Sequence, residues 1–218
     1  MHKDVKSEIA ISIIVLVALL VGGCVLLQRK KAQSDLDTAV CKQESGIVFL
    51  GDSITALENW NALFGISCIV NAGISGNTTD DVLTRLDSVI ISKPRKLFLM
   101  IGINDLLRNK DVAYVLSNYE IILNKIKAQS PVTIVYVQSA LPINNDILKN
   151  KNTDSQEIIE FNSKLKNIAA DRNLTYIDLY PSFCSSDNKL YRIYSKDGLH
   201  PGFLGYSTWK DLIDKYLE

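Results

Sequence analysis

The 218-residue sequence has little histidine and no excess of charge of either sign. It contains two histidines, and its 24 basic residues balance 24 acidic ones. A chain without net charge lacks the broad positive field that attracts nucleic acid, so we expect no nucleic-acid partner. Two histidines and four cysteines without ligand-like spacing do not form a typical metal site. We therefore expect no metal.

Phosphate-binding motifs are also absent. Neither G-x-x-x-x-G-K-[ST] nor G-x-G-x-x-G follows the first apolar strand-like segment. This absence argues against nucleotide chemistry, and we expect no cofactor. No internal repeat or low-complexity tract is evident. The spacing of the four cysteines does not resemble a disulfide framework.

A serine directly after an apolar segment is the first sign of chemistry. Residues 51–55 (GDSIT) follow the apolar run 47–50, so Ser53 lies in a glycine-led turn just past a predicted strand. Such a turn can expose a nucleophile at the edge of a sheet, although the G-x-S-x-G elbow is absent. Glycine and serine after a strand also form ordinary turns. Ser53 is a candidate nucleophile only if a base and an acid accompany it.

His200 is the only imidazole available to a soluble domain, because His2 precedes an apolar segment. Imidazole is the usual base for a serine near neutral pH. Asp197 lies three residues before His200, and Gly198 between them allows the chain to fold the carboxylate back towards the ring. A carboxylate on one ring nitrogen would fix the tautomer and stabilise the imidazolium. These residues complete a candidate Ser-His-Asp set.

Four short blocks resemble the SGNH (GDSL-type) hydrolase family and occur in that family's order, at residues 51–55, 71–76, 102–105 and 197–201. The resemblance covers about residues 46 to 217. It implies a catalytic triad of Ser53, His200 and Asp197. It also implies an oxyanion hole formed by the backbone N–H groups of Ser53 and Gly73 and the side-chain amide of Asn104.

Strand-like and helix-like segments alternate along the same region. Apolar runs at 46–50, 68–71, 96–101, 133–138 and 175–179 predict strands, and helical periodicity predicts helices at 79–92, 112–129, 154–171 and 201–217. Alternation of this kind indicates a parallel sheet covered by helices on both faces. We expect Asp154 to cap the third helix and Pro201 to open the last. The family resemblance implies a flavodoxin-like three-layer α/β/α sandwich with a five-stranded sheet.

The predicted activity is hydrolysis of short-chain O-acyl esters, most simply O-acetyl esters, of a carbohydrate or lipid-like substrate. The choice of acetyl rests on the run 71–105, which resembles platelet-activating-factor acetylhydrolase-like and carbohydrate acetylesterase-like members. Two alternatives stay open: an acyltransferase using the same triad, and a membrane-tethered binding protein without catalysis. Trp60, Ile74 and Asn77 are candidate substrate contacts, although such residues also form cores and turns.

The amino terminus predicts membrane attachment. Residues 9–27 are almost entirely apolar and, as a helix, would span about 28 Å, close to the thickness of a bilayer core. Residues 1–8 form a flank, 28–45 a polar tether and 46–218 the catalytic domain. An uncleaved anchor and a lipoprotein signal with Cys24 as the lipidated residue both fit. The catalytic domain is expected at the cell envelope, and the side of the membrane stays open.

Overall fold

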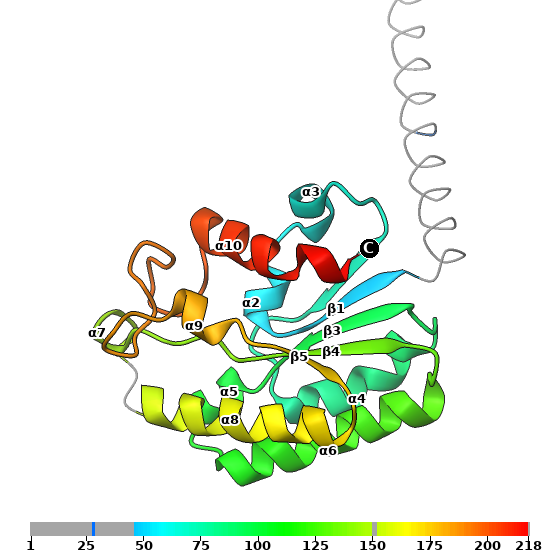
Figure 1. Cartoon of the computed structure of the whole chain (residues 1–218), viewed down its shortest axis with the longest axis horizontal. Coiled ribbons are helices and arrows are strands. Elements are labelled where there is room, and N and C mark those ends of the chain that lie inside the picture. The colour runs from blue at the N-terminus through cyan, green and yellow to red at the C-terminus, as the bar shows by residue number, and fades with distance from the viewer. Residues whose placement is uncertain (1–27, 29–45, 150–151, 218) are drawn as a thin grey trace, which may run out of the picture. The chain divides into compact units, whose positions relative to one another are not determined.

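The computed structural model describes Gln28, residues 46–149 and residues 152–217. Five parallel strands form one sheet in the order β2-β1-β3-β4-β5 (Figure 1). This is the flavodoxin-like order, and it confirms the predicted sheet. The strands are β1 (Ile47–Gly51), β2 (Ile69–Gly73), β3 (Lys96–Met100), β4 (Ile134–Gln138) and β5 (Thr175–Ile177).

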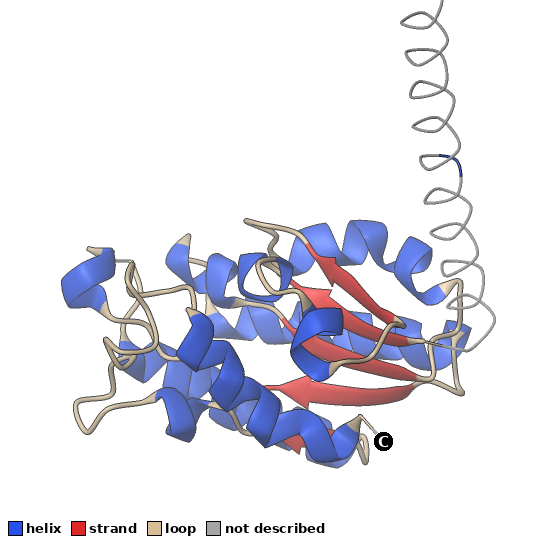
Figure 2. Cartoon of the chain, turned by 90° about the horizontal axis from the view of Figure 1, so that it is seen from above, coloured by secondary structure: helices blue, strands red, loops and turns tan. Residues whose placement is uncertain are grey.

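Helices cover both faces of this sheet, which makes three layers (Figures 1 and 2). One face carries α4 (Thr79–Ile90), α6 (Val112–Gln129) and α8 (Ser155–Asp171). The other carries α3 (Trp60–Phe64) and α10 (Phe203–Ile213), which continues into the 3-10 turn η1 (Asp214–Tyr216). Each of four short helices is the next helix after a strand: α2 (Ser53–Ala56), α5 (Ile103–Leu107), α7 (Asn145–Leu148) and α9 (Tyr180–Phe183). The sequence did not predict these short helices.

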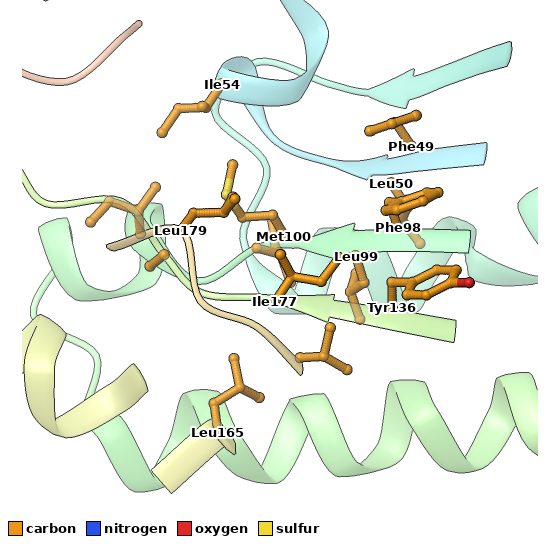
Figure 3. Packing of buried hydrophobic residues seen from close by; sticks show 14 of the residues in the cluster. Phe49, Leu50, Ile54, Phe98, Leu99, Met100, Tyr136, Leu165, Ile177 and Leu179 are labelled. Atoms are coloured by element: carbon orange, nitrogen blue, oxygen red, sulfur yellow. The ribbon is translucent and has the colours of Figure 1, made fainter. Parts of the chain in front are cut away.

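The central strands are apolar on both sides because helices cover both sides. All residues of β1 and β3 are buried. Phe49, Phe98 and Tyr136 pair in register on adjacent strands and stack in a row across the sheet, with ring centroids 4.7 and 4.6 Å apart (Figure 3). This row lies on the face covered by α3 and α10, since Phe49 also stacks on Trp60. These three rings line the sheet side of the core between the sheet and helices α3 and α10.

The helix starts agree with the sequence except at the last helix. The Asp154 side chain accepts a hydrogen bond from the Glu157 N–H and caps α8, as predicted. Pro201 does not open α10, which begins at Phe203 with Gly202 as its N-cap. The Gly202 N–H donates to the Tyr194 carbonyl at 2.6 Å, and Gly202 itself has an extended backbone.

Trp60 is a core residue, so the prediction that it contacts substrate is wrong. Its side chain is 1% exposed, and its ring stacks on Phe49 with centroids 4.2 Å apart. The ring of Trp209 from α10 packs edge-on against the Trp60 ring at 5.1 Å, and the Trp60 indole N–H donates to the Thr55 carbonyl. Trp60 therefore joins α3 to the sheet and to α10 and does not face solvent.

Two further expectations concern the cysteines and the membrane. Cys68 is disulfide-bonded, so the spacing argument against disulfides is wrong for this residue, whereas Cys184 is a free thiol. Across residues 46–149 and 152–217, no helix combines the length and apolar character needed to cross a bilayer. The predicted anchor at 9–27, with Cys24, and the tether from residue 29 lie outside the described residues.

We predict that Trp60→Ala lowers the free energy of unfolding by about 3–5 kcal/mol, because it opens a cavity beneath α3 and α10 and removes an indole hydrogen bond. Leu57→Ala is the matched control, since Leu57 is 61% exposed and its truncation should cost no more than about 0.5 kcal/mol. Urea unfolding measures both. Equal losses in the two variants would contradict the assignment of Trp60 to the core.

Candidate active site

Ser53 lies at the first position of α2, directly beyond the carboxyl end of β1. Asp52 is the N-cap of this helix, and its Oδ1 accepts a hydrogen bond from the Ile54 N–H at 2.9 Å. Asp52 thus caps the helix that carries Ser53. Ser53 itself is 8% exposed. The strand end and the cap together hold the hydroxyl in a nearly buried position.

Two glycines allow α2 to pack across the strand ends. Gly51 and Gly73 pair in register at the ends of β1 and β2. A Cβ on Gly51 would lie 2.4 Å from the Met100 carbonyl oxygen, and one on Gly73 would lie 2.4 Å from the Ala56 backbone nitrogen. Both distances are shorter than any real contact of a Cβ atom. A side chain at Gly51 would clash with the Thr55 side chain of α2 and with the backbone of β3, and one at Gly73 would displace the backbone of α2.

The structure brings Ser53, His200 and Asp197 into one hydrogen-bonded row. The Ser53 Oγ lies 2.8 Å from the His200 Nε2, although the two residues are 147 positions apart in the chain. The His200 Nδ1 lies 2.6 Å from the Asp197 Oδ2. The side chains of His200 and Asp197 are 29% and 54% exposed. A hydroxyl, an imidazole and a carboxylate in this order match the arrangement that activates a serine.

The loop before α10 orients the carboxylate of Asp197. Gly198 adopts a left-handed conformation with φ of +83°, so the predicted turn is present. The Asp197 Oδ1 accepts hydrogen bonds from the backbone N–H groups of Leu199 and His200 and from the Ser195 hydroxyl. Partial burial opposes ionisation, but the hydrogen bonds from His200, Leu199 and Ser195 prevail and hold the pKa of Asp197 well below its usual range. Asp197 is thus a carboxylate whenever the fold is intact near neutral pH.

Both further oxyanion candidates lie at the same edge of the sheet, but each already donates a hydrogen bond. The Gly73 N–H donates to the Asn71 Oδ1 at 2.9 Å. The Asn104 Nδ2 donates to the Asn77 carbonyl oxygen, also at 2.9 Å. An amide nitrogen carries two hydrogens, so Asn104 keeps one for another acceptor. The single hydrogen of Gly73 is already in use.

Ile74 and Asn77 differ in how open they are to a substrate. The Ile74 side chain is 47% exposed at the edge beside Gly73. The Asn77 Oδ1, in contrast, accepts a hydrogen bond from the Arg85 Nε at 2.8 Å. The Ile74 side chain is therefore accessible from outside, whereas the Asn77 side-chain oxygen is bonded to Arg85.

Asp105, the residue after Asn104, anchors the third block to the start of α4. Its buried carboxylate accepts hydrogen bonds from the Thr79 N–H and, at 2.6 Å, from the Thr79 hydroxyl. The Thr79 hydroxyl also accepts a hydrogen bond from the Asn118 amide of α6. Asp105 itself lies on α5, and its bonds to Thr79 tie α5 to the start of α4. Burial raises the pKa of Asp105 above its ordinary value.

Sequence reasoning missed three residues that support the site. Ser195 donates to Asp197, the Tyr206 hydroxyl of α10 donates to the Ile54 carbonyl at 2.8 Å, and Arg85 of α4 contacts the ends of two site segments. Ser195 carried a weak signal, because a hydroxyl two residues from an acid often bonds to it. Tyr206 and Arg85 carried none: Ile54 lies 152 residues from Tyr206, and the two partners of Arg85, Gly51 and Asn77, lie 34 and 8 residues from it.

A family model places the chain among known proteins. The model of the GDSL-like lipase/acylhydrolase family matches residues 49–207, which include all the site residues described above. The chain belongs to this family. Platelet-activating factor acetylhydrolase IB subunit alpha1 of Homo sapiens is 27% identical over 173 residues, which cover 76% of this chain and 72% of that protein. Acetylxylan esterase of Geobacillus stearothermophilus is 28% identical over 148 residues, 63% of this chain and 66% of that protein.

Solved structures of this family have the same fold. The lipase/acylhydrolase from Enterococcus faecalis superposes with a TM-score of 0.67 at 27% identity and covers 79% of this chain and 94% of its own. The family and its esterases identify the chain as a hydrolase that acts on ester bonds, in agreement with the sequence resemblance.

In this GDSL-family chain, the residue before the serine has an unusual environment. Burial raises the pKa of Asp52 to about 7, although the hydrogen bond from Ile54 opposes the shift. The Asp52 Oδ2 is buried and has no hydrogen-bond partner among the described residues. A proton on this oxygen avoids placing an uncompensated charge in the core beside Ser53.

We predict that Asp52→Asn removes a pH-dependent loss of stability. The folded protein keeps the Asp52 proton up to about pH 7, whereas the unfolded chain releases it near pH 4, so wild-type stability falls as pH rises between these values. The slope is at most about 1.4 kcal/mol per pH unit. Urea unfolding at about pH 5 and about pH 8 measures it, with the exposed Asp111→Asn as control. A wild-type advantage over Asp52→Asn that grows with pH would contradict this account.

Proposed function

We propose that the chain is a serine esterase that cleaves short-chain O-acyl esters, in the simplest case O-acetyl esters, through an acyl-enzyme. The observation that carries this proposal is the hydrogen-bonded row of Ser53, His200 and Asp197, with distances of 2.8 and 2.6 Å. Family membership makes the chain an ester hydrolase, and this row supplies the nucleophile, the base and the orienting acid.

The first half of the reaction forms the acyl-enzyme. The His200 Nε2 accepts the proton of the Ser53 hydroxyl while the Oγ attacks the carbonyl carbon of the ester. Asp197 holds the opposite ring nitrogen and stabilises the imidazolium that results. The imidazolium then gives its proton to the leaving alcohol oxygen as the bond between the carbonyl carbon and that oxygen breaks.

Negative charge on the carbonyl oxygen needs donors at the same edge of the sheet. The Ser53 backbone N–H and the second amide hydrogen of Asn104 fill this role directly. In the resting enzyme the Gly73 N–H donates to the Asn71 Oδ1. To stabilise the oxyanion, this N–H either donates to both acceptors at once or gives up its bond to Asn71. Each donor of this kind typically lowers the barrier by roughly 3–4 kcal/mol.

The second half of the reaction releases the acid. Water takes the place of the departed alcohol, the His200 Nε2 accepts a proton from it, and its oxygen attacks the acyl carbon. The bond from that carbon to the Ser53 Oγ then breaks, and the proton returns to the serine. The same row of residues therefore serves both halves. An alcohol acceptor in place of water would turn the reaction into acyl transfer.

The choice of a short acyl group draws on the relatives and on the exposed residues at the site. The platelet-activating factor acetylhydrolase subunit and the acetylxylan esterase are both named for acetyl esters. Ile74, half exposed beside Gly73, offers a small apolar contact to a short acyl chain. Trp60 does not contribute a wall, because it is buried in the core.

We expect Ser53→Ala to lower kcat/KM for p-nitrophenyl acetate by roughly 10⁴- to 10⁶-fold, because the nucleophile is lost while the fold keeps its core. Ser92→Ala is the matched control, since Ser92 is an exposed serine after α4 whose hydroxyl, within the described residues, bonds only to the Val89 carbonyl. Release of p-nitrophenol by the full-length chain measures both. Equal rates for wild type and Ser53→Ala would refute a serine mechanism and would favour the binding-protein alternative.

A series of p-nitrophenyl esters tests the acyl group. We expect kcat/KM to be highest for acetate and to fall as the acyl chain lengthens, with acetylated xylose or glucose also releasing free acetate. Acetate release in the presence of an added sugar alcohol separates hydrolysis from transfer, because a transferase would form the new ester instead. A rate that rises steadily towards long acyl chains would contradict the short-chain assignment.

A further inference from the structure

Arg85 lies on α4, one turn beyond its capping box, with its guanidinium partly buried against the edge of the sheet that carries the site. Its Nη2 donates to the Gly51 carbonyl oxygen at 3.1 Å, at the end of β1. Its Nε donates to the Asn77 Oδ1 at 2.8 Å, in the loop between β2 and α4. One side chain thus joins the strand that leads to Ser53 with the loop that follows β2.

The same two partners hold the oxyanion side of the site. The Gly51 carbonyl also accepts the Ile74 N–H at 3.2 Å, directly after Gly73. The Asn77 carbonyl accepts the amide hydrogen of Asn104 at 2.9 Å. Arg85 therefore contacts both residues whose backbone carbonyls set the positions of Ile74 and Asn104.

We propose that Arg85 is a positioning residue for the esterase reaction, which ties the carboxyl end of β1 to the Asn77 loop and so fixes the Asn104 amide relative to the Ser53 hydroxyl. The inference rests on the function proposed above. Arg85 acts through Asn77 and Gly51 and is not itself a catalytic residue.

The chemistry of the side chain suits this role. Both acceptors are neutral oxygens, and no ion pair of Arg85 is found within the described part of the chain. Burial lowers the pKa of Arg85 and Asp81 one turn earlier raises it, yet a guanidinium stays charged at any physiological pH. Its planar fork reaches two acceptors in fixed directions, which the single ammonium of lysine cannot do with equal geometry.

Arg108, at the end of α5, provides a matched comparison because it binds the same loop. Its Nη2 donates to the Gly76 carbonyl at 2.9 Å, but that bond is exposed. Arg108 has no bond to Gly51 or Asn77 among those found in the described residues. Both arginines bind the loop, and only Arg85 also binds the end of β1. A difference between their variants therefore isolates the connection between loop and strand.

The test compares steady-state hydrolysis of p-nitrophenyl acetate by the full-length wild type, Arg85→Ala, Arg85→Lys and Arg108→Ala. We expect Arg85→Ala to lower kcat by about 10- to 100-fold with KM changed less than about threefold, because a small misplacement of a transition-state donor affects turnover more than binding. Arg85→Lys should fall between wild type and Arg85→Ala. Arg108→Ala should stay within about threefold of wild type.

Two further measurements separate positioning from a merely structural role. Guanidinium at about 10–50 mM should restore part of the kcat of Arg85→Ala, because the free ion can occupy the space left by the arginine side chain. It should restore none of the kcat of Asn104→Ala. Sodium chloride is the ionic control. In a double-mutant cycle, Arg85→Ala should cost little in the Asn104→Ala background, because its effect passes through that amide. Urea unfolding confirms that each variant is folded, and Arg85→Lys serves if Arg85→Ala is not.

The proposal is overturned if Arg85→Ala and Arg108→Ala lose equal activity, if the loss appears in KM alone, or if the losses of Arg85→Ala and Asn104→Ala multiply. Failure of the proposed function gives a different result, because Ser53→Ala would then match wild type in the same assay.

Discussion

The site depends on the close approach of α2 to the ends of β1 and β2. Gly51 and Gly73 lie side by side in the sheet, and neither has room for a Cβ atom beneath the short helix that carries Ser53. This packing brings the hydroxyl to the carboxyl edge of the sheet, beside the point where the strand order reverses between β1 and β3. Open α/β sheets bind ligands at such a point. The other functional groups of the site, on His200 and Asn104, then have to be brought to the Ser53 hydroxyl.

They reach it from distant parts of the chain. His200 arrives on the loop before α10, and that helix is tied back to α2 by the hydrogen bond from Tyr206 to the Ile54 carbonyl. Asn104 arrives after β3 and is joined to the Asn77 loop. Asp105 is bonded to Thr79 at the start of α4, and Arg85, in the middle of the same helix, is bonded to Gly51 and Asn77. The nucleophile, the base and the amide are thus held by separate elements that pack on a common sheet.

Much of the fold was predictable because its signals are local. Buried parallel strands are short apolar runs, and amphipathic helices repeat with their own period, so β3 and α6 could be located from the sequence within one residue. Capping at Asp154 was predictable for the same reason, since the side chain bonds three residues ahead. The start of α10 was not, because the Gly202 N–H bonds to Tyr194 across a loop.

By itself, the sequence determined the chemistry that is available: a serine after the first predicted strand, one histidine after the apolar segment, and an aspartate three residues before that histidine. The scarcity of histidine made that assignment possible, since the other imidazole, His2, precedes the apolar segment. Only the tertiary structure decided that Trp60 packs in the core, that the Gly73 N–H is already bonded, and that Arg85 joins the strand to the loop. Those outcomes depend on which side chains meet when the helices pack on the sheet. Such contacts join residues on different elements, so the local spacing of residues in the sequence does not predict them.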